Sequence, residues 1–183
     1  MRLDPIDIVP YDPAWETAYA DERDRVTTAL AGWLTGPVEH IGSTSVPGLP
    51  AKPIIDMLAR VPKWDPALTW PLADALAAIG WVHAPEPTDD AQRKWSFCFP
   101  DARWRTHHLH VVGEDWNWRP LLAFRDHLRT HPADAAEYAR IKTELAATDR
   151  HDRPAYRAGK APFIESILTR LSAEGETRTI KLE

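Results

Sequence analysis

Cysteine is nearly absent from this sequence: Cys98 is the single one among 183 residues. One thiol forms neither an intrachain disulfide nor a cysteine-based zinc site, so both are excluded within one chain. The sequence also lacks a run of about 18 apolar residues, and its first ten residues contain no apolar segment typical of a signal peptide. These absences favour a cytoplasmic protein and predict neither export nor a membrane-spanning helix.

Positive charge is not in excess either. The net charge is −5, so the composition does not predict a general nucleic-acid-binding surface. Residues 1–90 carry 6 Lys or Arg and 14 Asp or Glu, whereas residues 91–183 carry 16 and 13. This division is consistent with a cation bound by one half and an anionic ligand bound by the other. Chance variation of exposed helix faces explains it equally well.

The remaining composition is typical of a globular protein. Hydrophobic residues make up 44% of the chain and charged residues 27%. A length of 183 residues fits one domain. The last residues have no evident apolar face, so we predict a single domain over residues 1–174 and a tail over residues 175–183.

The spacing of apolar residues predicts an α+β fold with a helical C-terminal third. Strands are expected at residues 6–10, 38–42, 52–61, 94–100 and 105–113. Two of these alternate well enough to pair with each other, namely 94–100 and 105–113. Helices are expected at residues 12–34, from about 65 to 80 with Pro71 as an alternative start, and from 116 to about 173 with breaks near Pro132 and at 149–154. The proline-rich residues 84–90 are interpreted as an exposed loop.

The stretch 39–58 combines a Gly-Ser turn with an aspartate in an apolar run. Backbone N–H groups and hydroxyls at a tight turn form a concave surface that accepts phosphate oxygens. The turn expected to do so consists of Gly42, Ser43, Thr44 and Ser45. Asp56 follows on the next strand, where a carboxylate is suited to bind Mg²⁺ beside a nucleoside triphosphate. Similar pairs occur in many loops, and a lone strand aspartate is as often a hydrogen-bonded structural residue.

Five ordered segments carry a resemblance to a known family: "VEHIGSTSVPGLPAKPIIDM", "RTHHLHVV", "FRDHLRTHP", "EYARIKTELA" and "YRAGKAPFIESIL". They resemble the successive motifs of the GrpB (UPF0157) family of the nucleotidyltransferase superfamily, from about Ile8 to Leu171. The resemblance implies a small mixed sheet flanked by helices, with Gly-Ser at the start of the active-site turn. It also implies transfer of a nucleoside monophosphate from a triphosphate to a hydroxyl, amine or phosphate, with two metal ions.

This sequence departs from the superfamily pattern at the metal-binding carboxylates. Asp56 occupies the first carboxylate position, but the second, two residues later, is Leu58. A later strand offers no acid and instead has His108 and His110 on one face. If His110, and with it His40, points toward Asp56, the site is a carboxylate and imidazole centre that favours Zn²⁺, Mn²⁺ or Fe²⁺ over Mg²⁺. Alternatively, His110 is a general base while Asp56 alone holds Mg²⁺.

Basic side chains of the helical third are candidates for binding phosphate. Lys142 and Lys160 lie on apolar helix faces, and Lys160 follows Tyr156 by four residues. We predict that both ammonium groups reach the same cleft as Asp56, with Tyr156 beside them, whereas snorkelling toward water is the alternative. A similar role in binding the substrate is expected of Lys52, Arg105 and Arg125.

Three functions fit these features. The first is an enzyme that binds a nucleoside triphosphate or another phosphorylated small molecule with Mg²⁺, Mn²⁺ or Zn²⁺, and transfers a nucleotidyl group to a small-molecule or protein acceptor. The second is a ligand-binding module that has lost transfer, for which Leu58 argues. The third is a helper domain, because GrpB-like segments also occur fused to dephospho-coenzyme A kinases. Neither a nucleic acid nor a membrane is an expected partner.

Overall fold

The computed structural model describes residues 5–180, and their side chains through Ala173. Its centre is a five-stranded sheet in the order β1-β2-β5-β4-β3. The strands are β1 (Glu39–Ile41), β2 (Ile55–Val61), β3 (Val82–His83), β4 (Lys94–Pro100) and β5 (Arg105–Gly113). β2 and β5 are parallel, and the other neighbouring pairs are antiparallel. The predicted α+β fold with a mixed sheet is therefore confirmed.

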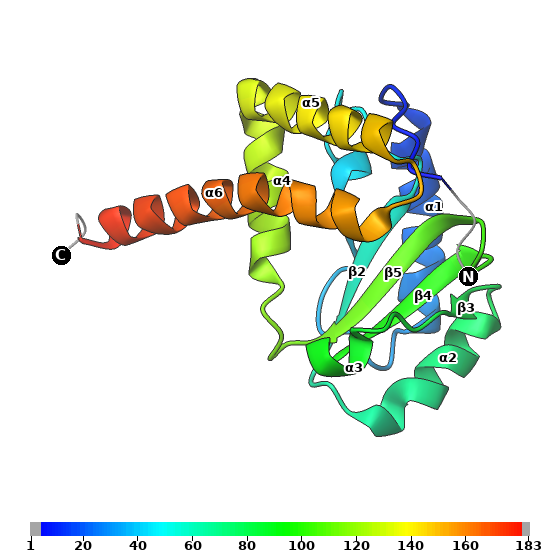
Figure 1. The fold of residues 1–183 in the computed structure, drawn as a ribbon. Coiled ribbons are helices and arrows are strands. Elements are labelled where there is room, and N and C mark those ends of the chain that lie inside the picture. Colours follow the sequence, from blue (N-terminus) through cyan, green and yellow to red (C-terminus); the bar gives the residue numbers. More distant parts are fainter. Residues whose placement is uncertain (1–4, 181–183) are drawn as a thin grey trace.

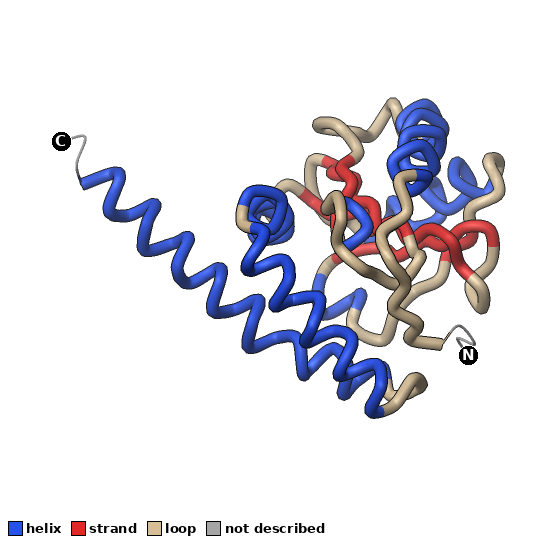
Figure 2. The backbone as a smooth tube through the Cα atoms, turned by 90° about the horizontal axis from the view of Figure 1, so that it is seen from above, coloured by secondary structure: helices blue, strands red, loops and turns tan. Residues whose placement is uncertain are grey.

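Helices cover both faces of this sheet (Figure 1). They are α1 (Ala14–Ala29), α2 (Thr69–Ala77), α3 (Asp89–Gln92), α4 (Arg119–Thr130), α5 (Pro132–Thr148) and α6 (Arg153–Ile180), with short 3₁₀ turns at Ser43–Ser45 and Pro66–Leu68. Helices α1 and α2 lie on one side of the sheet, α5 and α6 lie on the other, and α4 packs beside the β1 edge (Figure 2). The breaks expected near Pro132 and at 149–154 separate α4, α5 and α6.

The main hydrophobic core lies between the sheet and helices α1 and α2. Met57, Phe97 and Leu109 come from three adjacent strands, and all three are fully buried there. Because successive residues of a strand point to opposite faces, the neighbouring positions of β2 and β5 face α5 and α6 instead. Asp56, His108 and His110 lie on that second face.

The strand predicted at residues 6–10 is shorter than expected. In the described chain, Val9 forms an isolated bridge with Ala51 through hydrogen bonds of 2.9 and 3.0 Å. Pro10 follows at once, and Pro50 and Pro53 flank the partner position. Because proline lacks the N–H group that a β-ladder requires, the pairing does not extend.

The helix expected over residues 12–34 ends at Ala29, and a turn follows. The Trp33 N–H donates to the Leu30 carbonyl at 2.9 Å, and this hydrogen bond closes a tight turn directly after the helix. Strands β4 and β5 have the predicted bounds, whereas β2 begins three residues later than predicted. The second helix begins at Thr69 after a 3₁₀ turn, so its start is delayed nearly to Pro71.

Residues 84–90 are not simply the exposed loop that their prolines indicate. The Asp89 carboxylate accepts hydrogen bonds from the Glu86 N–H at 2.9 Å and from the Ser96 hydroxyl at 3.1 Å. These bonds fold the segment back onto β4, and Asp89 is 4% exposed. The short strand β3, which precedes this segment, and helix α3, which begins within it at Asp89, were not predicted.

Helix α6 is longer than predicted and continues to Ile180. Its C-terminal part extends away from the sheet and the other helices (Figure 1). The backbone of the predicted tail is therefore helical through residue 180, and residues 181–183 lie outside the described chain. The domain boundary at residue 174 stays a prediction. Across residues 5–180, no helix combines the length and apolar character needed to cross a membrane.

Candidate functional site

Asp56 lies in the second position of β2, beside β5. It pairs in register with His108, and Leu58 pairs with His110, so these alternate residues share the face directed toward α5 and α6. The Nδ1 atom of His108 is 3.5 Å from the Asp56 Oδ1 atom, and the rings of His108 and His110 are 4.1 Å apart. One ligand atom from each of Asp56, His108 and His110 lies within 4.8 Å of the others.

Gly42 leaves room for this carboxylate. Its φ of +71° and ψ of −174° define a conformation that is essentially restricted to glycine. A Cβ atom at Gly42 would lie 2.7 Å from the Asp56 Oδ2 atom. Two independent features therefore require a glycine at this position: the backbone conformation and the close approach of Asp56.

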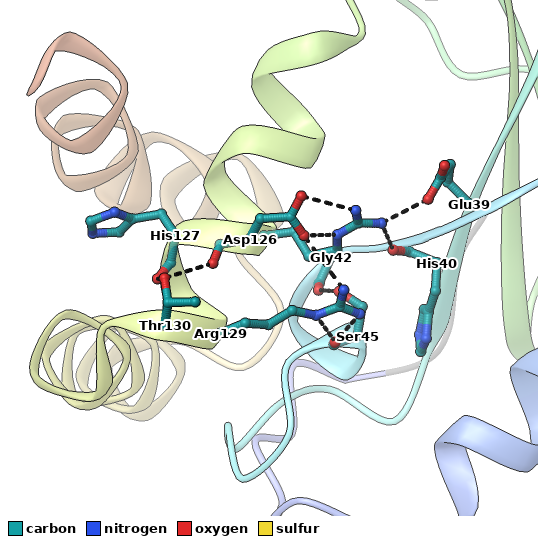
Figure 3. Close-up of polar contacts among 9 residues, drawn as sticks. Glu39, His40, Gly42, Ser45, Asp126, His127, Arg129 and Thr130 are labelled. Carbon is teal, nitrogen blue, oxygen red and sulfur yellow. Dashed lines mark hydrogen bonds and ion pairs between the residues drawn. The ribbon is translucent and has the colours of Figure 1, made fainter. Parts of the chain in front are cut away.

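The turn after Gly42 is held by hydrogen bonds from several directions. The Ser45 hydroxyl donates to the Gly42 carbonyl at 2.5 Å, and the Thr44 hydroxyl donates to the Ile54 carbonyl at 3.2 Å. The guanidinium of Arg129 donates twice to the Ser45 carbonyl, at 2.7 and 2.9 Å, and so attaches α4 to the turn (Figure 3). The turn is thus rigidly positioned beside Asp56.

A cavity of 470 Å³ opens in front of Asp56, between the sheet, the turn, the segment around Glu86, and helices α5 and α6. Six cationic side chains and two carboxylates lie on its wall, together with two histidines. The cations are Lys52, Lys94, Lys142, Arg153, Arg157 and Lys160. Such an excess of positive charge favours an anionic ligand.

Lys142 and Lys160 reach this cavity from adjacent helices. Lys142 is 1% exposed, and its Nζ atom donates to the Pro50 carbonyl at 2.5 Å. Burial lowers the pKa of Lys142 to about 7, and the charge of Lys160 acts in the same direction. Burial also lowers the pKa of Lys160 to about 8, although Asp56 opposes the shift. An anion in the cavity would favour the charged form of both lysines.

Tyr156 packs against one of these basic groups, Lys160. The Nζ atom of Lys160 lies 4.4 Å from the centre of the Tyr156 ring. Burial raises the pKa of Tyr156 to about 12, so its hydroxyl is a neutral donor at physiological pH. Tyr156 therefore contributes a hydrogen-bonding group and a ring face to the cavity wall.

Glu86 supplies a second carboxylate from outside the sheet. Its Oε1 atom is 3.4 Å from Arg157 and 4.0 Å from the Nε2 atom of His108, and its Oε2 atom is 3.8 Å from Lys94. Burial raises the Glu86 pKa, but the charges of His108, Arg157 and Lys94 outweigh burial and lower it overall. His108 is thus flanked by the carboxylates of Asp56 and Glu86.

The charge states of Asp56 and His110 follow from burial and from these neighbours. Burial raises the Asp56 pKa, but the hydrogen bond and charge of His108, with His110 and Lys52, outweigh burial and lower it overall. Burial, with the charges of His108 and Lys94, places the His110 pKa well below its usual value. An ionised carboxylate and a neutral imidazole are the forms that bind metal ions.

The structure does not bring His40 to this group of potential metal ligands. His40 pairs with Met57 and therefore lies on the opposite face of the sheet from Asp56. Its Nε2 atom donates to the Thr44 hydroxyl at 3.1 Å, and its ring stacks on Tyr19 at 4.5 Å. Burial lowers the pKa of His40 to about 4, so it remains a neutral structural residue.

The other predicted substrate-binding residues divide into two groups. Those on the cavity wall are Ser43, Thr44, Lys52, Lys142, Tyr156 and Lys160. Gly42 and Ser45 instead build the turn. Arg105 is absent from the described cavity wall and donates to the Ala102 carbonyl at 3.2 Å. Arg125 binds Glu39 at 2.9 Å and the His40 carbonyl at 3.0 Å, so it connects α4 to β1.

Four charged residues and one histidine of this site were not predicted: Glu86, Lys94, His108, Arg153 and Arg157. Strand alternation had already put His108 on the same face as His110. Arg153, Tyr156, Arg157 and Lys160 follow the spacing of one helix face, which is a usable signal. We find no sequence signal for Glu86, because its position depends on how residues 84–90 fold back.

One of the similar proteins is a kinase. A dephospho-CoA kinase of Mycolicibacterium paratuberculosis is 27% identical to this chain over 195 residues, an alignment that covers 91% of this chain and 46% of the kinase. This chain therefore corresponds to less than half the length of that protein.

Closer similarity identifies the family. Residues 5–170 match the family described as GrpB protein. A UPF0157 protein of Pseudomonas aeruginosa is 42% identical over 173 residues, which cover 93% of this chain and 69% of that protein. The crystal structure of a conserved protein GrpB from Enterococcus faecalis is similar with a TM-score of 0.74 and 30% identity, over 90% of this chain and 99% of that chain. This chain therefore belongs to the GrpB family.

Proposed function

We propose that the protein binds a phosphorylated small molecule, first of all a nucleoside triphosphate, together with a divalent metal ion in the cavity in front of Asp56. The observation that carries this proposal is the composition of the cavity wall. Six cationic side chains and two carboxylates accompany a group of three potential metal ligands. Multiple cations favour a polyanion such as a triphosphate, and a metal ion adds to that preference.

The donor atoms fit a transition metal ion better than Mg²⁺. Asp56, His108 and His110 would hold the ion, which would supply positive charge beside a phosphate oxygen when bound. Two imidazoles with one carboxylate favour Zn²⁺, Mn²⁺ or Fe²⁺, whereas Mg²⁺ prefers oxygen ligands. We therefore propose Zn²⁺ or Mn²⁺ as the first ions to test.

The basic side chains of α5 and α6 are proposed to bind the phosphates. Lys142 and Lys160 are desolvated, so an anion would gain more from each ammonium group than it would in water. Arg157 adds a planar guanidinium, which suits two phosphate oxygens at once. Ser43 and Thr44 border the same space from the turn.

Nucleotidyl transfer is the reaction proposed for a nucleotide bound in this way. The bond from the α-phosphorus to the bridging oxygen breaks, a bond from the α-phosphorus to the acceptor forms, and pyrophosphate leaves while the acceptor proton passes to solvent. Resemblance to the nucleotidyltransferase superfamily supports this reaction. The acceptor is a small molecule or a protein.

Ligand binding without transfer is the second candidate, and Leu58 favours it. A two-metal transfer site needs further carboxylates near Asp56, and Leu58 occupies the position of one of them. In this case the protein acts as a binding or helper domain, a role that the kinase relative also suggests.

The test is calorimetric titration of the chain with ATP, alone and with Zn²⁺ or Mn²⁺. We expect metal-dependent ATP binding in the wild type and its loss in Asp56→Asn, because this change removes one charge while keeping the shape. Asp74→Asn, on α2 at the far side of the sheet, is the matched control and should bind as the wild type does.

Two outcomes separate the candidates. Release of pyrophosphate in the presence of candidate acceptors supports transfer, whereas ATP binding without release supports the binding domain. Equal ATP and metal affinity in the wild type and Asp56→Asn would contradict the assignment of this site under both candidates.

A further inference from the structure

A second cavity of 190 Å³ adjoins the first. Ser43 and Leu121 lie on the walls of both cavities, so the two spaces are neighbours across these residues. The second cavity lies mainly between α4 and α6, and its wall is largely apolar. Characteristic members of this wall are Val46, Phe124, Leu128, Ile164 and Leu168.

The few polar groups of the second cavity are already engaged. The Arg125 guanidinium binds Glu39 at 2.9 Å, the His40 carbonyl at 3.0 Å and Asp126 at 2.7 Å. Burial raises the pKa of Tyr138, so its phenol remains neutral. The second cavity therefore has fewer groups available to bind a phosphate than the first cavity has. It also has few hydrogen-bond partners for the polar edge of a nucleobase.

We infer that the acceptor in the proposed reaction is an alkyl or aryl phosphate whose phosphate lies in the cationic cavity and whose apolar group enters the second cavity. This inference rests on the proposed function, because it assumes that the first cavity binds phosphate. Ser43 lies where the two parts of such a molecule would join, since it borders both spaces. A small acceptor, rather than a protein, is the class that two adjoining cavities fit.

The volume limits the size of the apolar group. A dry protein cavity of about 150 Å³ accommodates benzene, a molecule of six carbons. The 190 Å³ of the second cavity therefore suit a phenyl ring or an alkyl chain of about six carbons. Transfer of such an apolar group from water into the cavity should strengthen binding by roughly tenfold or more.

The test compares methyl, butyl, hexyl and octyl phosphate by calorimetric titration of the full chain. These probes carry the same charge and differ in apolar length. We expect affinity to rise at least about tenfold from methyl to hexyl phosphate and to change little from hexyl to octyl, because the cavity is then filled.

The variant Leu168→Trp fills the second cavity without altering the basic side chains. It should bind methyl phosphate as the wild type does but lose the rise with chain length. Thr169→Trp introduces the same indole at an exposed neighbouring position and should retain the rise. A rise of equal size in Leu168→Trp, or no rise in the wild type, would overturn the inference.

The same titrations distinguish this inference from the proposed function. If methyl phosphate binds and Lys160→Met weakens it, but chain length has no effect, the second cavity is not a subsite and the proposed function stands. If hexyl phosphate binds, with affinity unchanged by Lys160→Met and by metal, the apolar cavity binds on its own and the proposed phosphate site is wrong. If no probe binds, the inference fails, and the ATP titration alone decides the proposed function.

Discussion

The two faces of the central sheet carry histidines in opposite surroundings, and His107 and His108 of β5 illustrate the difference. The His107 ring lies against Trp81 on the face covered by α1 and α2. Its Nε2 atom is 3.3 Å from the Ala18 carbonyl, and its Nδ1 atom is 2.8 Å from the Thr106 hydroxyl. Both ring nitrogens are thus satisfied by hydrogen bonds, and burial lowers the His107 pKa.

His108, the next residue, faces the cationic cavity. Its Nδ1 atom is directed to Asp56 and its Nε2 atom to Glu86, at 3.5 and 4.0 Å. The Nε2 atom is buried and forms no hydrogen bond within the described residues. A buried nitrogen without a partner is costly for folding alone, and a bound ligand would compensate for it.

This contrast indicates how to separate structural from functional histidines in one strand. His40 and His107 share the apolar face and have nearby protein partners, whereas His108 and His110 share the polar face with Asp56. Substitutions on the first face should therefore change stability, and those on the second should change binding.

The largest effect is expected from Leu109→Ala, on the apolar face of β5. Leu109 is fully buried, so truncation should reduce the free energy of unfolding by about 2–5 kcal/mol. His110→Ala, at the next position but on the other face, should cost less stability and weaken metal binding instead. Urea denaturation and metal titration of both variants check this. Loss of metal binding in folded Leu109→Ala would contradict the assignment of stability to one face of the sheet and binding to the other.

The second effect concerns the pH dependence of stability through Lys142. Its pKa falls from 10.5 unfolded to about 7 folded. The unfolded chain therefore binds more protons between these values, and stability should rise with pH across that window. Lys142→Met should be more stable than the wild type near pH 7 by about 2–4 kcal/mol, and the difference should disappear near pH 10.

The measurement is chemical denaturation of the wild type and Lys142→Met from pH 6 to 10. Arg140→Met, on the exposed face of α5, is the control and should show no such convergence. A wild type that is more stable than Lys142→Met at pH 7 would mean that protein groups alone already compensate the Lys142 ammonium group.

The third effect compares His108→Gln with His107→Gln. His108→Gln should weaken Zn²⁺ or Mn²⁺ binding by about tenfold to a hundredfold, because it removes one ligand of the proposed group. His107→Gln should leave metal affinity unchanged and reduce stability by about 1–3 kcal/mol, because it disturbs buried hydrogen bonds. Metal titration and thermal unfolding of the pair provide the readouts; equal metal affinities would remove His108 from the site.

Several parts of this fold could be predicted from the sequence because they depend on local patterns. Strands β4 and β5 alternate well enough to predict their pairing, and their predicted bounds agree with the structure. The same alternation separates His107 from His108. Lys142 and Lys160 could be assigned to a cleft because each interrupts an apolar helix face.

Other parts depend on packing between distant segments and left no local pattern. The face occupied by His40 follows from its register with Met57, across a connection whose geometry the sequence does not specify. Glu86 enters the cavity because Asp89 holds its loop against β4. The second cavity lies mainly where α4 meets α6, and the turn after Gly42 and Tyr138 of α5 complete its wall, so no single segment predicts it.

The smallest effect is expected from Glu86→Gln, which tests whether the polar face is organised for an anion. Glu86 is one of two carboxylates on the cavity wall and partly neutralises Lys94 and Arg157. Removing its charge should strengthen binding of methyl phosphate by about twofold to fivefold, because those cations are then less compensated. Glu137→Gln, on α5 and absent from the described cavity wall, should have no effect. Calorimetry in low salt provides the measurement, and weaker phosphate binding by Glu86→Gln would show that this carboxylate positions the cations rather than competing for them.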